Sequence, residues 1–391
     1  MRLLFLIQGM THHDQPGYHD GFQRVLARGL LTDYQQLCYP AMVKSLGYDR
    51  FCDRVIQKAR QMDAHVVFLQ FPHGFRELTP DFFTGLRRAL PGVIICSSNG
   101  DGFSPIIKPL PRALVTAARY SDLTFTTSMG WISRQWIKQG ARNIILMPNG
   151  FCQVRFGKAA PSKSPEFDIA FVGSLYRSRN PLRRFHPFNR RRKTMVEQLT
   201  RRYGKKFGLF GHGWEGNPSW QGPLDYAAQE ACYQNARMVF GGSPHNRDPF
   251  YHSDRFFIAA VSGSPLVDTF IPGLGHFLLP DTHWHPVSQK SELVPTLDRL
   301  LDMDEVQLKS MGQRTREFCL DHHSQYHRVH NMIEIIHTLK EARDAGVLPV
   351  MPPLRYFHPH IRPRDIQHLA VWSWSPLAPR PKASGGIRHA S

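Results

Sequence analysis

A short helix expected at residues 253–263 carries side chains that could bind an anion at its first turn. Ser253 is a residue type that caps helices by accepting a backbone N–H, and Gly263 can take the left-handed conformation that ends them. The helix between them should be little more than two turns long and should lead into an apolar strand at 265–268. Unpaired N–H groups and positive potential gather at a helix N-terminus, so a diphosphate could bind beside Ser253, although most short capped helices are purely structural.

Basic residues are concentrated in the segment 176–206. This segment holds twelve Lys and Arg residues against one acid, Glu197, a local balance of +11 in a chain whose formal net charge is +18. Such an excess indicates an anionic partner, which could be nucleic acid, a membrane face or a phosphorylated substrate. A solvated helix face with a basic loop would account for the same residues, so both interpretations stay open.

Two series of short apolar runs, separated by segments long enough for helices, predict two parallel sheets. The first series is 3–7, 66–70, 93–96, 123–126 and 143–147, and the second is 167–171, 207–210, 238–240, 265–268 and 276–279. Each series is Rossmann-like, so the fold class is α/β with two such domains. Gly173 and Ser174 directly follow the first strand of the second series, at the sheet edge where this class places its ligands.

Composition sets the expected domain limits. Small, polar and proline residues predict a linker at 156–166, between an N-terminal domain at 1–155 and a second domain at 167–340. Residues 341–391 form a Pro- and Arg-rich tail that we expect to be partly docked on the body of the protein.

Cysteine usage and hydropathy indicate the compartment. The six cysteines are scattered without a CxxC pair, which is typical of a reducing compartment. The sequence has no apolar run of about eighteen residues, and the apolar run at 3–7 is too short for a signal peptide. We therefore expect a cytoplasmic protein, with peripheral contact to a membrane surface as an alternative suggested by the charge.

Three motifs in the second half resemble the group 1 branch of the GT-B glycosyltransferases, in particular the spore-maturation CgeB-like family. The motifs are the run 167–174 ending in Val-Gly-Ser, the loop Leu-Phe-Gly-His-Gly-Trp at 209–214, and Ser253-Asp254-Arg255 leading to Ala259-Ala260-Val261-Ser262-Gly263. Their order is similar to the family's layout over 167–336, and the first half is similar to its acceptor domain. The resemblance implies two Rossmann-like domains, N-terminal for the acceptor and C-terminal for the donor, that face each other across a cleft.

The chemistry that the resemblance implies is transfer of a sugar from a nucleotide sugar, first of all a UDP-sugar, with no cofactor and no metal required. Gly173 and Ser174 would bring backbone N–H groups to the phosphates, and Arg177, Arg179 and Arg255 would supply cationic contacts. The other expected donor-binding residues are Gly211, His212, Asp254, Ser262 and Gly263. Without the resemblance, ordinary turns and solvated loops would explain Gly173, Arg177 and Arg179 equally well.

Two positions depart from the family pattern. Ile258 stands where the family has the Glu that is expected to hydrogen-bond the ribose, and Phe250 stands at the position of an earlier Glu of the broader family. Neither side chain can accept such a bond. Asp254 lies one helical turn before Ile258 on the same face, so our hypothesis is that Asp254 takes over the ribose contact.

A base for the acceptor hydroxyl is expected where a strand of the first half ends. His12, His13, Asp14, His73 and Asp101 all follow predicted strands there. Asp101 and His13 are the preferred catalytic residues, although a loop residue bonded to backbone is the simpler role for each. The histidines at 322, 323, 327 and 330 invite a metal hypothesis, but we do not expect a metal site, because ligating His is usually joined by acids or Cys.

The acceptor stays open between two enzymatic interpretations, and a third interpretation is not enzymatic. An anionic acceptor could be a membrane-associated glycan or lipid of the cell envelope, or nucleic acid in the form of a modified DNA base, and the Arg-rich segment permits both. The third interpretation is a degenerate transferase that binds nucleic acid or glycan without catalysis, which Ile258 and Phe250 motivate.

Overall fold

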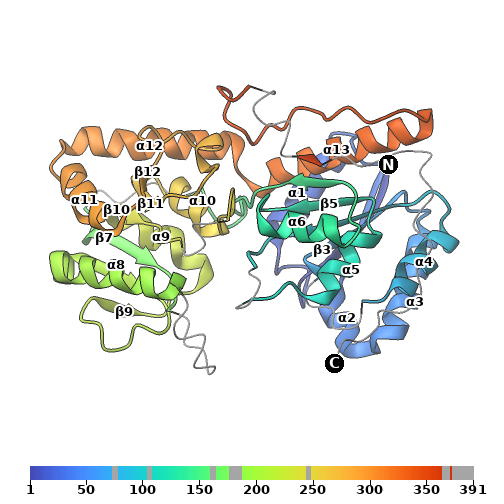
Figure 1. Cartoon of the computed structure of the whole chain (residues 1–391), viewed down its shortest axis with the longest axis horizontal. Coiled ribbons are helices and arrows are strands. Elements are labelled where there is room, and N and C mark those ends of the chain that lie inside the picture. The colour runs from blue at the N-terminus through green and yellow to red at the C-terminus, as the bar shows by residue number, and fades with distance from the viewer. Residues whose placement is uncertain are drawn as a thin grey trace.

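The computed structural model describes residues 1–72, 78–103, 108–158, 164–175, 187–243, 248–362 and 370–371. These residues form two units, each a mainly parallel sheet with covering helices, which lie side by side along the long axis of the molecule (Figure 1). The two series of apolar runs therefore correctly predicted two Rossmann-like halves. Parts of the predicted linker (159–163) and of the predicted tail (363–369 and 372–391) lie outside the described residues.

The first sheet has the order β13-β6-β5-β4-β3-β1-β2, and only the pairing of β13 with β6 is antiparallel. Its strands are β1 (Arg2–Ile7), β2 (Asp33–Cys38), β3 (Val66–Gln70), β4 (Ile94–Asn99), β5 (Leu123–Thr126), β6 (Ile144–Leu146) and β13 (Ala370–Val371). The helices of this half are α1 (Pro16–Ala27), α2 (Tyr39–Leu46), α3 (Tyr48–Gln61), α4 (Pro80–Ala89), α5 (Arg112–Tyr120) and α6 (Trp131–Lys138). Along β1, Leu3 and Phe5 join one apolar cluster and Leu4 and Leu6 another, so both faces of the sheet are buried.

The second sheet is entirely parallel, in the order β12-β11-β10-β7-β8-β9. Its strands are β7 (Phe167–Val172), β8 (Phe207–Phe210), β9 (Trp220–Gly222), β10 (Ala236–Phe240), β11 (Leu266–Thr269) and β12 (His285–Val287). The helices of this unit are α8 (Pro187–Tyr203), α9 (Gln229–Gln234), α10 (Asp254–Val261), α11 (Leu293–Leu301) and α12 (Glu305–His322), and α13 (Gln325–Ala345) follows them in the chain. No helix in the described part of the chain is long and apolar enough to cross a membrane.

The prediction of a strand at 276–279 was wrong. That segment belongs to a turn that begins with the 3-10 helix Leu274–His276, which follows Gly273 in a left-handed conformation (φ 91°). Phe277 and Leu278 lie in this turn and are fully buried. The apolar run therefore reflects the burial of these side chains, although the backbone is not extended. The true edge strand is β12, a few residues further on.

The last long helix returns to the first unit. α12 packs on α10 of the second unit, whereas α13 packs on α1 (Figure 1). Gly21 of α1 allows this close approach, because a Cβ there would lie 3.0 Å from Cγ2 of Val329 on α13. With β13 added to the first sheet, the C-terminal part of the chain is tied to the N-terminal unit, while the exact domain limits stay predictions.

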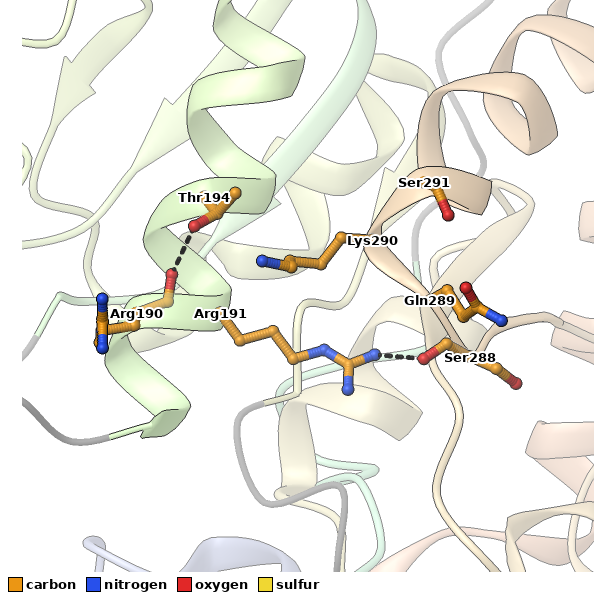
Figure 2. A pocket seen from close by; sticks show the side chains of 7 residues that line it. All are labelled: Arg190, Arg191, Thr194, Ser288, Gln289, Lys290 and Ser291. Atoms are coloured by element: carbon orange, nitrogen blue, oxygen red, sulfur yellow. Dashed lines mark hydrogen bonds between the residues drawn. The ribbon is translucent and has the colours of Figure 1, made fainter.

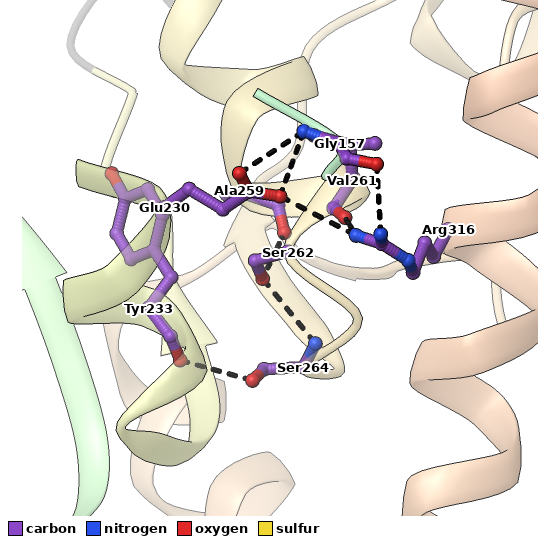
Figure 3. Close-up of polar contacts among 8 residues, drawn as sticks. All are labelled: Gly157, Glu230, Tyr233, Ala259, Val261, Ser262, Ser264 and Arg316. Carbon is purple, nitrogen blue, oxygen red and sulfur yellow. Dashed lines mark hydrogen bonds and ion pairs between the residues drawn. The ribbon is translucent and has the colours of Figure 1, made fainter. Parts of the chain in front are cut away.

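Two buried arginines join the segments that pass between the units. Arg328 of α13 donates to the carbonyl oxygen of Pro148 (2.9 Å), just after β6, and its guanidinium lies 5.4 Å from the ring centre of Phe257 on α10. Arg316 of α12 pairs with Glu230 of α9 at 3.3 Å, and both side chains are about nine-tenths buried. Figure 3 shows that this pair also holds Gly157, at the start of the predicted linker: its N–H donates to Glu230 (2.9 Å) and its carbonyl accepts from Arg316 (2.9 Å).

Candidate functional site

A cavity of about 450 Å³ lies between the two units, at the carboxyl ends of their strands. The first unit contributes Asp14 from the loop after β1, Tyr18 from α1, and Asp101, just after β4. The second unit contributes Tyr226, Tyr251, Ser253, Asp254 and Arg255, and the segment after β6 adds Asn149, Cys152 and Arg155. The predicted residues Asp101, Asp254 and Arg255 are therefore brought together in one cavity.

Two helices begin at this cavity. The N-cap residues are Gln15 for α1 and Ser253 for α10, and neither side chain makes a capping hydrogen bond. The position of Ser253 was predicted correctly, but its hydroxyl does not accept an N–H as we expected. Gly263 does take the left-handed conformation (φ 87°) that ends the eight-residue helix. The positive ends of two helices without side-chain caps thus face the same space.

Two arginines add positive charge to the cavity. Arg255 lies in the first turn of α10 and is half-buried. Arg155 lies over the ring of Tyr226, 5.5 Å from its centre, and donates to the backbone carbonyls of His13 (3.3 Å) and Asp14 (3.4 Å). Sequence reasoning missed Arg155, which follows a strand end by nine residues and belongs to no motif.

The carboxylates of the cavity already have partners. Asp254 accepts a hydrogen bond from the hydroxyl of Tyr226 (2.6 Å) and one from the N–H of Arg255 (2.9 Å). Asp101 pairs with Lys108 and accepts from the N–H of Gly102 (2.9 Å). Lys108 balances the charge of Asp101, whereas the two neutral donors hold the carboxylate of Asp254 in place and leave it charged. Arg155 and Arg255 are therefore the cations that an anion in this cavity would meet.

Asp14 and His13 lie in the exposed loop before α1. The Asp14 carboxylate accepts from the N–H of Met10 (2.6 Å) and the hydroxyl of Thr11 (2.7 Å), and this last bond is the main cause that lowers the pKa of Asp14. The Asp14 carboxylate therefore stabilises the loop in which it lies. His13 is not among the described residues that line the cavity. Its backbone carbonyl accepts a hydrogen bond from Arg155, which does line the cavity.

Two tyrosines of the second unit point hydroxyls at carboxylates. Burial and then the charge of Asp254 raise the pKa of Tyr226, and burial and then the charge of Asp101 raise the pKa of Tyr251. Both phenols therefore stay protonated and donate. The Tyr251 hydroxyl reaches Asp101 of the first unit at 3.4 Å, a long bond across the cavity. Neither tyrosine lies in a periodic apolar pattern, so sequence analysis had no signal for them.

The two units also touch beside the cavity. The side-chain amide of Asn149 donates to the carbonyl oxygens of Gly100 (3.1 Å) and His252 (2.9 Å). The Ser128 hydroxyl, after β5, donates to Asp248 at 2.7 Å, and burial raises the pKa of Asp248. These contacts hold the cavity walls at a fixed separation in this structure.

Gly173, Ser174, Gly211 and His212 lie where β7 and β8 end, and none of them lines the described part of the cavity. Their two loops are hydrogen-bonded, Leu175 N–H to the carbonyl of His212 at 2.9 Å. Gly211 (φ 124°) makes the contact possible, because a Cβ there would lie 2.7 Å from the carbonyl oxygen of Gly173. The loops therefore share the correct edge of the sheet, and their phosphate role stays a prediction. Arg177, Arg179 and His73 lie outside the described residues.

Ser262 and Gly263 end α10, and the structure does not bring them to the cavity. An eight-residue helix is about 12 Å long, which separates them from Ser253. Ser262 is fully buried, and its hydroxyl donates to the carbonyl of Ala259 at 2.6 Å (Figure 3). Their contacts in the structure are those of a helix end packed in the core.

The two positions that depart from the family pattern are both in the core. Ile258 is fully buried, and Phe250 is 6% exposed with a left-handed backbone (φ 66°). Neither lines the described part of the cavity, whereas Asp254 does.

The late histidines have separate partners. His323 is fully buried and its ring accepts from Arg328 (2.9 Å), while the ring of His327 contacts the hydroxyl of Ser324 (2.8 Å) at the N-cap of α13. Within the described residues, no group of three or more His, Cys, Asp and Glu side chains could hold a metal ion.

Part of the sequence matches a known protein family, and the structure is similar to solved structures. A family model described as "Glycosyl transferase-like" matches residues 190–334. Similar solved structures include the Anabaena protein Alr3699/HepE in complex with UDP and glucose, which is 12% identical with a TM-score of 0.53 over 86% of this chain and 99% of that one. A search of the curated proteins found no match.

Two further structures have the same architecture. One, from E. coli, is described as "Trehalose-6-phosphate" bound with UDP-2-fluoro glucose; it is 12% identical, with a TM-score of 0.57 over 90% of this chain and 100% of that one. The other is an alpha-glucosyltransferase in complex with UDP and a 13-mer DNA containing a HMU base; it is 9% identical, with a TM-score of 0.52 over 86% and 98% of the two chains. The CgeB-like branch stays a prediction. Two Rossmann-like sheets that face each other across a cavity give this chain the GT-B fold of glycosyltransferases, as predicted.

Proposed function

We propose that the protein transfers a sugar from a nucleotide sugar, most simply a UDP-sugar, to an acceptor hydroxyl in the cavity between the units. The observation that carries this proposal is the convergence of Arg255, Arg155 and the uncapped N-termini of α1 and α10 on one cavity of a GT-B fold. The similar structures with UDP or a UDP-sugar bound support the choice of donor.

The chemistry follows from where charge develops. When the bond to the sugar breaks, the leaving diphosphate gains negative charge, and donors already aimed at it lower the barrier. The guanidinium of Arg255 and the positive end of α10 would supply that stabilisation without a metal. Asp254, on the same turn, is the group proposed to accept hydrogen bonds from the ribose hydroxyls in place of the family Glu.

On the acceptor side, Asp101 is the proposed base. It lines the cavity from the first unit, and Lys108, the N–H of Gly102 and Tyr251 hold its carboxylate in place. His13 keeps the weaker claim, because only its backbone carbonyl is engaged beside the cavity. The acceptor class, membrane-associated glycan or DNA base, stays open at this site.

The test is donor binding followed by turnover. UDP-, GDP- and dTDP-sugars are screened for thermal stabilisation, where a ligand at one hundred times its Kd should add about 2.7 kcal/mol, and UDP release is then followed without acceptor. Arg255→Gln should weaken the best donor roughly tenfold or more, because it removes a charge-assisted hydrogen bond. Lys309→Gln is the matched control, since Lys309 pairs with Glu305 on the surface of α12.

The possible results separate the hypotheses. Donor binding with no slow hydrolysis and no transfer would favour the degenerate, non-catalytic alternative. If no nucleotide sugar stabilises the wild-type protein, or if Arg255→Gln binds the donor as well as Lys309→Gln does, the proposed site is wrong.

A further inference from the structure

A second concavity, of about 700 Å³, lies on the second unit and shares no lining residue with the cavity between the units. We call it the basic groove: Arg190, Arg191 and Thr194 of α8 form one wall, and the turn 288–291 after β12 forms the other. Figure 2 shows Lys290 extending from the turn toward α8, and Arg191 extending from α8 to the carbonyl of Ser288, to which it donates at 2.9 Å. Every described lining residue is polar or cationic.

Two cations of the basic groove, Arg190 and Lys290, have no carboxylate partner in the described part of the chain. The carboxylate of Glu292 accepts hydrogen bonds from the N–H groups of Ser288 (2.9 Å) and Gln289 (3.1 Å) and so stabilises the turn that carries Lys290. Glu197 of α8 pairs instead with Lys193, at 3.6 Å.

The basic groove lies at the ligand-binding edge of the second sheet. The next residue of α8, Arg192, is buried and donates to the carbonyls of Ser174 (2.8 Å) and Gly242 (3.1 Å), which follow β7 and β10. Arg192 thereby fixes the start of α8 on the loops where strands of this class present ligands. Arg190 and Arg191, which precede Arg192 on α8, therefore lie next to the carboxyl ends of the strands of the second sheet.

An exposed aromatic residue, Phe270, follows β11, the strand paired with β12 ahead of the groove turn, and is not one of the residues that line the groove. Phe270 is 42% exposed, and its N–H donates to the carbonyl of Val287 (2.9 Å), the residue before Ser288. β11 and β12 pair in parallel up to Thr269 and Val287, so Phe270 and the groove turn leave the sheet side by side. Cations that follow a backbone together with an aromatic platform are the combination that binds single-stranded nucleic acid.

We propose that the basic groove binds the phosphate backbone of a single-stranded nucleic acid, with Arg190 and Lys290 on phosphates and Phe270 stacked on a base. A free phosphate would leave most of a 700 Å³ groove empty. A bilayer presents a broad face of head groups, whereas the cations here lie in a groove between α8 and the turn 288–291, which a single chain of phosphates can enter. The binding needs no donor sugar, so it can fail or succeed independently of the transferase function proposed above.

The test is fluorescence anisotropy of a labelled single-stranded 20-mer between 50 and 200 mM NaCl, with the full chain. Arg190→Gln combined with Lys290→Gln should weaken binding at least tenfold at 100 mM NaCl. It should also lower the salt slope of log K by roughly 1.4, about 0.7 for each phosphate of the single strand that no longer meets a cation. Phe270→Leu should weaken binding roughly fivefold and leave the salt slope unchanged, because it removes stacking and no charge.

The matched control removes the same two charges elsewhere. Lys193→Gln combined with Lys309→Gln takes away two exposed lysines that pair with glutamates one turn away and do not line the groove. This control should keep the wild-type affinity within about twofold. Thermal unfolding of every variant checks the fold, and the single variants Lys290→Gln and Phe270→Leu suffice if the double variant unfolds.

Three results would overturn the proposal. The first is an equal loss of binding in the groove variant and the matched control, which would make the binding a general effect of charge. The second is full competition by 10 mM inorganic phosphate, which would make the groove a site for one phosphate. The third is sedimentation with phosphatidylserine vesicles that is lost in the groove variant while oligonucleotide binding is unchanged, which would make it a membrane contact.

Discussion

Replacing Arg316 by Met removes the cation from the buried ion pair that holds Gly157. The side chains of Arg316 and Glu230 are 10% and 7% exposed, and the guanidinium also donates to the carbonyls of Val261 and Gly157. Arg316→Met therefore leaves a carboxylate buried without its counter-charge and removes a donor from two carbonyls. Figure 3 shows these contacts together at the end of α10.

The expected loss follows from the burial. Removing one partner of a buried pair costs roughly 3–5 kcal/mol, and we expect about 3 kcal/mol because Gly157 N–H still donates to Glu230 at 2.9 Å. At roughly 2–4 °C for each kcal/mol, the range for an unfolding unit of 150–250 residues, the Tm of the second unit should fall by about 6–12 °C.

The loss should depend on pH. Burial raises the pKa of Glu230, and Arg316 opposes that shift, so the variant should raise the pKa of Glu230 further. A carboxyl group whose pKa is higher in the folded state than in the unfolded state loses stability as pH rises through that interval. The deficit of Arg316→Met relative to wild type should therefore be larger at pH 8 than at pH 5.

The assay is differential scanning calorimetry of wild type, Arg316→Met, Glu230→Gln and the double variant at both pH values. Glu230→Gln in the Arg316→Met background should recover part of the loss at pH 8, because it removes the unpaired charge. A deficit that is equal at pH 5 and pH 8 and that Glu230→Gln does not relieve would refute the assignment of this energy to the ion pair.

Two further predictions concern α10 and its surroundings. Gly312→Ala should destabilise the protein by roughly 2–3 kcal/mol in thermal unfolding, because its Cβ would lie 1.9 Å from the carbonyl oxygen of Gly263; Gly275→Ala, whose Cβ meets only ordinary contacts at 3.4 Å, should change the Tm little. Tyr226→Phe removes the 2.6 Å hydrogen bond to Asp254 and should weaken UDP-sugar binding roughly fivefold in calorimetric titration, whereas unchanged affinity would argue against a ligand role for Asp254.

The interior of the fold could be predicted from the sequence because parallel strands buried on both faces are continuous apolar runs. The predicted runs 66–70, 123–126 and 207–210 coincide with β3, β5 and β8. β2 was missed because it is an edge strand whose residues Asp-Tyr-Gln-Gln are mostly half-buried, so no apolar run marks it. An edge strand pairs with only one other strand and carries polar residues, so a search for apolar runs does not find it.

The site was predictable only where a residue follows a strand or starts a helix. Asp101 and the pair Asp254 and Arg255 meet that condition, and all three line the cavity. Tyr226 reaches it from a short 3-10 helix (Tyr226–Ala228) and Tyr251 from the loop before α10, and their positions depend on how the two units pack. Long-range packing of this kind leaves no local pattern in the sequence.

The geometry of α10 explains why Ile258 is compatible with a donor site on this helix. Asp254 and Ile258 are one turn apart on the same face, a rise of about 6 Å, and α10 enters the core within that distance, since residues 256–261 are all buried. A carboxylate at position 258 would sit unpaired in the core and would favour unfolding, whereas the carboxylate of Asp254 meets both the cavity and the hydroxyl of Tyr226. The ribose contact that the family places one turn deeper would thus move to the first turn of α10, beside Arg255, so that one helix end carries both proposed donor contacts.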